Sequence, residues 1–568
     1  MKTLLKKLTK SNNHLFWGLL LIFITAGLFL NPSSLFKNTY LGPVDLLFHW
    51  YPYQINQLTE TPQNYLLSDQ ALQFIPWRVF TSHWMQKGTL PLWNSAQYCG
   101  APFLANSQSA LLYPPHLMSW FLPLQWALFL VAFSKLLVSG WGMFLYLHER
   151  KLHFLAALFG GITFMLFGFQ VLWLGHPHTN SFIWIPLILY FTDKLHCKIS
   201  PYILAGWMFC LLCILLGGHP ETIFMSLLVI GAYCLYQDGL RFNHVSRILL
   251  IAGLSIFLIS SIQWIPFLEY MKNSTALKER SMGLVNDSQA IRSLVTWIFP
   301  DFFGNPTLMN EWIKPDIFYQ FNYNEAVSGY VGILPFLLGI IGIFVLSRSS
   351  YYWFWIITLV LSFILAYDIP IIGKILAHLP GISLIHPKRM VIIISLALII
   401  LSSETLSCFL KQNTVKIPAP ALLICFLLPL SFIPFKFSPQ FLQYFLSPLI
   451  DNNIQTVLPY LGTQIYQTTV FWILPSVCFL LSLFLLSAKP NFKLRNIMGF
   501  GILALTITNL LYFGYGYNPV IKLPYPLEVK CRTDYVNTLS SGRFLSLDEW
   551  TVYPPNVATL TGDADIRG

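Results

Sequence analysis

The sequence predicts an all-α integral membrane protein that crosses the bilayer about thirteen times. Of its 568 residues, 55% are hydrophobic and only 10% are charged, whereas about a quarter of the residues in a typical soluble chain are charged. The mean hydropathy is +0.60. Apolar runs of about twenty residues also recur along the chain, and each is long enough to cross the hydrocarbon core as a helix.

The predicted spans begin near the N-terminus and continue to residue 516. The first is not a cleavable signal peptide, because it is long, lacks a small-residue cleavage site and is followed by further spans. We place the spans at residues 14–30, 124–147, 152–174, 180–193, 201–217, 222–237, 247–268, 328–347, 351–367, 389–410, 418–435, 468–487 and 497–516.

The distribution of basic residues predicts the orientation of these spans. With the N-terminus in the cytoplasm, the cytoplasmic segments carry 16 basic and 3 acidic residues, whereas the longer outer segments carry 17 basic and 19 acidic residues. Lys and Arg are enriched in cytoplasmic loops of membrane proteins. The net charge of +11 therefore reflects topology. It does not indicate nucleic-acid binding, which would require basic residues clustered on one soluble face.

Most of the sequence outside the spans is predicted on the outer side. Residues 1–516 form the multispanning membrane domain, with large outer loops at about 31–123 and 269–327. Residues 517–568 turn polar and include strand-like segments. We expect this outer segment to be the start of a soluble domain that is truncated at residue 568, because a strand pair alone is marginally stable.

Two short patterns in the first outer loop place a carboxylate four residues before a polar side chain. Asp45 precedes His49 and Asp69 precedes Gln73, a spacing that puts both members on one helix face. Such a pair can orient a substrate hydroxyl and remove its proton. The alternative is that both Asp residues are helix N-caps, a position that Asp favours.

Longer motifs in the chain resemble one bacterial family. They are SDQALQFIPWR at 68–78, GTLPLWNSAQYCGAPFLANSQSALLYPPHLM at 88–118, GGHPET at 217–222, NEAVSGYVGILP at 324–335, HPKR at 386–389 and PPNVATLTGDADIRG at 554–568. In this order, the motifs are similar to the signature of the YfhO family of membrane proteins, and they cover almost the whole chain.

The YfhO family resembles the C-type glycosyltransferases, which take a sugar from a polyprenyl-phosphate carrier on the outer membrane face. Those enzymes carry a catalytic Asp in the first outer loop. The resemblance implies a glycosyltransferase of the bacterial cytoplasmic (inner) membrane, with its C-terminus outside. It makes Asp69 the first candidate for the catalytic base and Asp45 the second. The implied partners are a lipid-linked sugar donor, an envelope glycan or lipid acceptor, and membrane lipids.

Sugar transfer also needs cations or a divalent metal to hold the leaving phosphate. Arg78 and the pair Lys388 and Arg389 are candidates, because Arg can clamp a phosphate with two hydrogen bonds. For the pair, anchoring at the membrane interface is an equal alternative. His and carboxylate side chains on the outer turns could bind a metal ion, although their spacing fits turn formation better. The remaining substrate-binding candidates are Trp93, Asn94, His219, Glu221 and Glu325.

Two other classes of function remain open. A lipid-linked glycan flippase or transporter would typically show internal repeats and charges at mid-membrane, whereas we find only Lys135 and Glu404 inside spans, away from their ends, and no repeat. A non-catalytic partner in envelope assembly is the third class. The enzyme hypothesis further predicts one outer pocket, lined by Asp69, Arg78, His219, Glu325 and Arg389.

Overall fold

The computed structural model describes most of the chain as helices with two short two-stranded sheets. The predicted span 418–435 and most of the segment after residue 523 lie outside the described residues. Those described are 11–49, 62–239, 241–275, 291–308, 322–367, 369, 385–411, 454–487, 492–523, 556 and 560.

Seven of the described helical stretches are long and apolar enough to cross a membrane. Three shorter apolar helices are α10 (Pro201–Leu215), α16 (Ile333–Val345) and α17 (Ser350–Ala366). The chain is therefore built as a membrane protein, while the count of about thirteen spans stays a prediction. The seven stretches are α2 (Ser11–Leu30), α5 (Leu124–Glu149), α6 (Phe154–Leu166) with α7 (Gly168–Leu172), α12 (His244–Lys272), Pro387–Met390 with α19 (Val391–Lys411), α23 (Ile454–Thr468) with α24 (Leu474–Ser487), and α25 (Phe492–Gly514).

Helix α12 has an exposed surface of large apolar side chains. Leu250, Leu254, Leu258 and Ile265 lie along this helix, and each is more than half exposed. A large exposed apolar patch is unfavourable in water and marks contact with a partner or a membrane. The apolar face of α12 is therefore of the kind that contacts a membrane or a partner.

The chain divides into two compact units, each assembled from separate parts of the sequence. Unit 1 comprises Met1–Ala26, Leu137–Leu172 and Gly283–Tyr515, and unit 2 comprises Gly27–Leu136, Trp173–Met282 and Gly516–Gly568.

Helix α19 is the centre of unit 1. It packs against α6, α16 and α17, and nearly all its residues are buried, as expected for a helix that is apolar on every side. Small residues allow this close approach: a Cβ added at Gly160 of α6 would lie 2.4 Å from Ser403 Oγ of α19. Contacts between small residues are a typical way for helices to associate in lipid.

The break between α6 and α7 fixes the loop that carries Glu325. Gly168 N donates a hydrogen bond to Tyr330 O at 2.7 Å. A Cβ at Gly168 would lie 2.2 Å from the carbonyl oxygen of Val327, so only glycine fits there. This contact holds α15 (Tyr323–Val327), the helix that contains Glu325, against α7.

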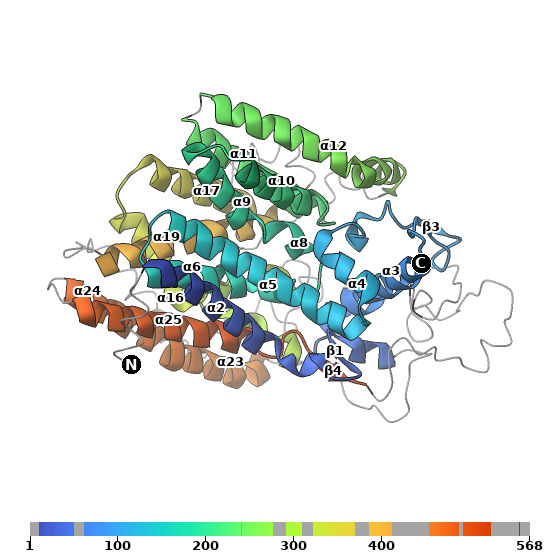
Figure 1. Cartoon of the computed structure of the whole chain (residues 1–568). Coiled ribbons are helices and arrows are strands. Elements are labelled where there is room, and N and C mark those ends of the chain that lie inside the picture. The colour runs from blue at the N-terminus through green and yellow to red at the C-terminus, as the bar shows by residue number, and fades with distance from the viewer. Residues whose placement is uncertain are drawn as a thin grey trace. The chain divides into compact units, whose positions relative to one another are not determined.

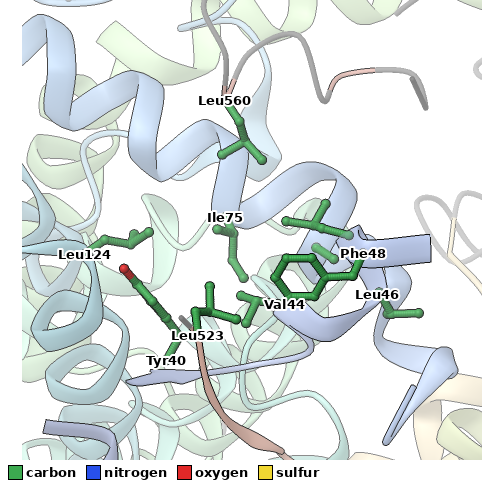
Figure 2. Packing of buried hydrophobic residues seen from close by; sticks show 10 residues of the cluster. Tyr40, Val44, Leu46, Phe48, Ile75, Leu124, Leu523 and Leu560 are labelled. Carbon is green, nitrogen blue, oxygen red and sulfur yellow. The ribbon is translucent and has the colours of Figure 1, made fainter. Parts of the chain in front are cut away.

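In unit 2, a strand that follows the last described helix pairs with the first loop. Strand β1 (Thr39–Leu41) pairs antiparallel with β4 (Val520–Lys522) (Figure 1). Leu523, directly after β4, packs with Tyr40, Val44 and Ile75 in one hydrophobic core (Figure 2). Residues 520–523, which follow the last described helix, are thus part of the same packed unit as the first loop.

A second core in unit 2 fixes the helices of the first loop. Phe74, Trp77 and Phe80 lie on or beside α3 (Ile75–Gln86) and pack against Phe103 and Leu111. Helix α3 also packs against α4 (Met118–Phe121). This aromatic packing positions Arg78, which lies on α3 between two of these aromatic residues.

Candidate functional site

Asp69 of unit 2 has an exposed carboxylate that is not used for capping. The residue has helical dihedral angles, and its side chain makes no capping hydrogen bond to the following turn. Although the side chain is exposed, nearby protein atoms remove part of its hydration, and this desolvation raises the pKa of the carboxyl above its ordinary value. Asp69 accepts no hydrogen bond from any described residue, so its oxygens are available to a ligand.

Asp45, the second predicted base, is committed to the backbone. Its Oδ1 accepts a hydrogen bond from Leu46 N at 3.2 Å, and its Oδ2 accepts one from Gln63 N at 2.8 Å. The side chain of its predicted partner His49 lies outside the described residues. The geometry therefore separates the two candidates, because only Asp69 keeps its carboxylate free within the described part of unit 2.

The sequence pattern pairs Asp69 with the amide of Gln73. In the structure, the amide that lies beside Asp69 and contacts another candidate turn is that of Gln70. Residues Gln70–Phe74 form a π-helical turn, which is wider than an α-turn and shifts the positions that share a face. Gln70 is buried, and its Nε2 lies 3.3 Å from His176 Nδ1. Because an amide nitrogen only donates, His176 Nδ1 accepts this hydrogen bond.

Arg78 lies on α3 and is held by a buried histidine. Its Nη2 is 2.8 Å from His116 Nε2, and His116 Nδ1 lies 3.1 Å from Ala110 O. An Arg nitrogen can only donate, so His116 accepts at Nε2 and donates at Nδ1 as a neutral ring. Burial lowers the pKa of Arg78 to about 10, so Arg78 stays charged at neutral pH. Its buried Nη1 has no hydrogen-bond partner among the described residues.

Lys135 is a buried cation on one of the predicted spans. It lies on α5 with 1% exposure, and its ammonium donates hydrogen bonds to Leu174 O at 2.8 Å, His176 O at 2.9 Å and Thr179 Oγ1 at 3.1 Å. All three N–H donors are therefore satisfied. Lys135 holds the GHPHT turn (residues 175–179) in place and has no donor left for a ligand.

The two His-containing turns meet in unit 2. The rings of His178 and His219 stack with centroids 3.9 Å apart, and Asn180 Nδ2 donates to Gly217 O at 2.8 Å. His219 also caps α11 (Pro220–Gln237), because its Nδ1 accepts a hydrogen bond from Thr222 N at 3.3 Å. The predicted candidate His219 thus has a structural role at this junction. Glu221, in the first turn of α11, is buried beside it.

A small cavity lies between Gln70, Arg78 and Lys135, with a volume of about 30 Å³. This volume has room for about one water molecule. A phosphate group could reach Arg78 through this cavity only if the surrounding side chains moved.

Trp93 and Asn94 lie in the short strand β2 (Trp93–Asn94), and only one of them is exposed. Asn94 is fully buried: its Nδ2 donates to Gln97 Oε1 at 3.1 Å, and its Oδ1 accepts from Ala96 N at 3.0 Å. Asn94 therefore shapes its own turn. Trp93 is 55% exposed and covers Gly100, where an added Cβ would lie 2.4 Å from Trp93 Nε1.

The remaining predicted residues lie in unit 1. Arg389 Nη2 and Nε donate to Glu325 Oε1 at 3.1 and 3.2 Å. Lys388 is buried with 6% exposure, and the Arg389 side chain is mostly covered. An interfacial anchor would keep its charged head in contact with water, so this burial favours an internal role for both basic residues.

The ion pair of Glu325 and Arg389 should couple energetically. In a double-mutant cycle with Glu325→Gln and Arg389→Gln, we expect a coupling energy of about 1–3 kcal/mol, because both partners are largely desolvated. Unfolding free energies in detergent micelles measure it. The control pairs Glu325→Gln with Arg348→Gln, since Arg348 is exposed; equal coupling in the two cycles would contradict a specific pair.

His176 should make the protein sensitive to acid. Burial, together with the charge of Lys135, lowers the pKa of His176 to about 3, whereas an unfolded His titrates near 6.5. The unfolded state then binds more protons between these values, so stability is complete above about pH 6.5 and falls as the pH drops towards 3. Melting temperatures between pH 7.5 and 4.5 should fall less steeply for His176→Asn than for the wild type. The control is His83→Asn, since His83 is exposed. If the slope of melting temperature against pH is the same for His176→Asn as for the wild type, His176 is not the source of the acid sensitivity.

The predicted site residues are divided between the two units. Within unit 2, the His219 turn and the first loop are joined by a hydrogen bond from Ser107 Oγ to Gly218 O at 2.8 Å, and unit 1 joins Glu325 to Arg389. The single pocket expected across all of them stays a prediction. In the described part of the chain, no group of three or more His, Cys, Asp and Glu side chains could hold a metal ion.

Comparison of the chain with protein-family models, with curated proteins and with solved structures finds no match. The resemblance to the YfhO family therefore stays a prediction.

Proposed function

We propose that the protein is a membrane glycosyltransferase that moves a sugar from a polyprenyl-phosphate donor to an envelope glycan or lipid. The observation that carries the proposal is the carboxylate of Asp69, which is exposed and makes no capping hydrogen bond. A general base needs a free lone pair within reach of the acceptor hydroxyl. Its raised pKa also makes it a stronger proton acceptor than an ordinary Asp.

The surroundings of Asp69 support this role. Gln70, the next residue, is fixed by His176, and Arg78 is fixed by His116. Catalytic groups that are held in place before substrate arrives do not lose free energy to reorganisation during the reaction. Arg78 supplies a positive charge and a buried N–H without a partner in the described structure, which suits the leaving phosphate once the side chains around the small cavity have moved.

The apolar exterior suits the lipid part of the donor. Helices such as α12 expose long apolar faces, and a polyprenyl chain is compatible with the same environment. The proposed reaction requires the acceptor and donor headgroups at the level of the first loop, on the outer side in the predicted topology.

A transporter would use mobile intramembrane charges, whereas the two charges predicted within spans, Lys135 and Glu404, are restrained in the described structure. Lys135 donates to three fixed acceptors. Glu404 of α19 lies 3.9 Å from Arg150, whose guanidinium also stacks on the ring of Tyr351. These contacts favour an enzyme over a transporter.

The test uses the full chain in lipid nanodiscs with a polyprenyl-phosphate donor carrying a radiolabelled sugar. We expect time-dependent loss of label from the donor and its appearance in added envelope glycan or lipid. Heat-inactivated protein is the control. If label moves across the bilayer of proteoliposomes without transfer, the protein is a flippase; if neither transfer nor movement occurs with a panel of sugar donors, the non-catalytic role replaces the enzyme.

A further inference from the structure

Unit 1 contains a cavity of about 470 Å³ that no predicted site residue lines. This volume falls within the range of small-molecule binding sites. The wall comes from four places in the sequence: the segment 299–308, Tyr330, the region of α23 and the following helical turn, and the C-terminal end of α25 with Tyr515.

One part of the wall is aromatic. Trp472 and Tyr512 lie with their ring centroids 5.5 Å apart, at an interplanar angle of 43°. Phe471 is 60% and Tyr515 is 87% exposed, and both line the same cavity. These rings present flat apolar faces that are open to a ligand.

The other part of the wall carries oriented polar groups. Asp301 Oδ1 accepts hydrogen bonds from Tyr323 Oη at 2.7 Å and from Asn305 Nδ2 at 3.0 Å, which leaves Oδ2 for a ligand. Asn509 Oδ1 accepts from Tyr330 Oη at 3.0 Å, so its amide nitrogen remains a donor. Gln464 donates from Nε2 to Tyr460 Oη at 2.9 Å, and its amide oxygen remains an acceptor.

This combination selects one class of ligand. Among the described residues that line the cavity there is no Lys, Arg or His, whereas a phosphate site uses such cations. A lipid chain would leave the amides and the carboxylate without partners, at a cost for each buried polar group. A sugar ring has an apolar C–H face that can lie on an aromatic ring, and its edge of hydroxyls can both donate and accept hydrogen bonds.

We propose that this cavity binds a neutral sugar unit, with its C–H face on Trp472 and its hydroxyls on Asp301, Gln464 and Asn509. The site lies wholly within unit 1. It does not depend on the proposed glycosyltransferase function, because a glycan can bind here whether or not sugar transfer occurs elsewhere in the chain.

The test is saturation-transfer difference NMR with the full chain in lipid nanodiscs, which avoids sugar-based detergents that would compete. The probes are glucose, galactose, mannose and N-acetylglucosamine and their short neutral oligomers. We expect saturation transfer to the ring protons of at least one probe. Trp472→Ala should weaken its binding at least about tenfold, and Trp472→Phe should restore part of the affinity.

Two matched variants distinguish this site from general effects. Trp353 is also exposed in unit 1 but does not line the cavity, so Trp353→Ala should bind sugar as the wild type does. Gln464→Leu keeps the size of the side chain and should weaken binding severalfold through the lost amide. The proposal is overturned if no probe binds, if both Trp variants lose affinity equally, or if an alkyl phosphate or fatty acid binds at Trp472 in place of every sugar.

Discussion

Replacing Asp69 with Asn is expected to slow sugar transfer by about a hundredfold to ten thousandfold, the usual contribution of a general base. Asn has the size of Asp but cannot accept a proton. Because Asp69 makes no capping hydrogen bond, the melting temperature should stay close to that of the wild type. The measurement is the initial rate of transfer from the radiolabelled donor in nanodiscs, with thermal unfolding followed in parallel.

Asp45→Asn is the matched control, and it should behave in the opposite way. The carboxylate of Asp45 accepts two backbone hydrogen bonds, and an Asn side chain can replace only one of these acceptors. We expect a loss of stability of about 1 kcal/mol with transfer largely kept. Normal transfer by Asp69→Asn would move the role of base to Asp45, and normal transfer by the double variant would exclude a carboxylate mechanism.

These two Asp residues show what sequence alone can and cannot resolve. Both lie four residues before a polar side chain, so the pattern treats them alike. The difference arises because the chain folds back to bring Gln63 N to Asp45, whereas nothing comparable reaches Asp69 in the described structure. Because Gln70–Phe74 form a π-helical turn, Gln70 takes the position beside Asp69 that the pattern assigns to Gln73. The spacing of residues in the sequence does not reveal that one turn is wider than an α-turn.

The helices were more predictable than their assembly. A predicted span at 247–268 corresponds to α12 (His244–Lys272), and one at 389–410 corresponds to α19 (Val391–Lys411), because long apolar runs fix helices locally. The pairing of β1 with β4 joins residues that are hundreds of positions apart. Each strand has only three residues, too few for an alternating pattern to be recognised.

The hydrogen-bond partners of Lys135 could not be predicted from the sequence for a different reason. Two of its three hydrogen-bond acceptors are backbone carbonyls, those of Leu174 and His176. Any residue type supplies a carbonyl, so no motif records such a site. The useful signal was the charge itself, since an ionisable residue within a membrane span usually has a partner or a function.

Lys135→Met is therefore expected to lower the free energy of unfolding by about 3 kcal/mol, because two carbonyls and the Thr179 hydroxyl lose a charged donor in a buried place. Met fills most of the volume of Lys, so cavity formation contributes little. Unfolding by denaturant in micelles measures the loss. The control is Lys37→Met, also in unit 2 but exposed, which should change stability by less than about 0.5 kcal/mol. Equal stability of the two variants would show that the hydrogen bonds of Lys135 offset no more than the cost of burying its charge. The position of the GHPHT turn would then depend on the stacking of His178 on Trp173 and His219.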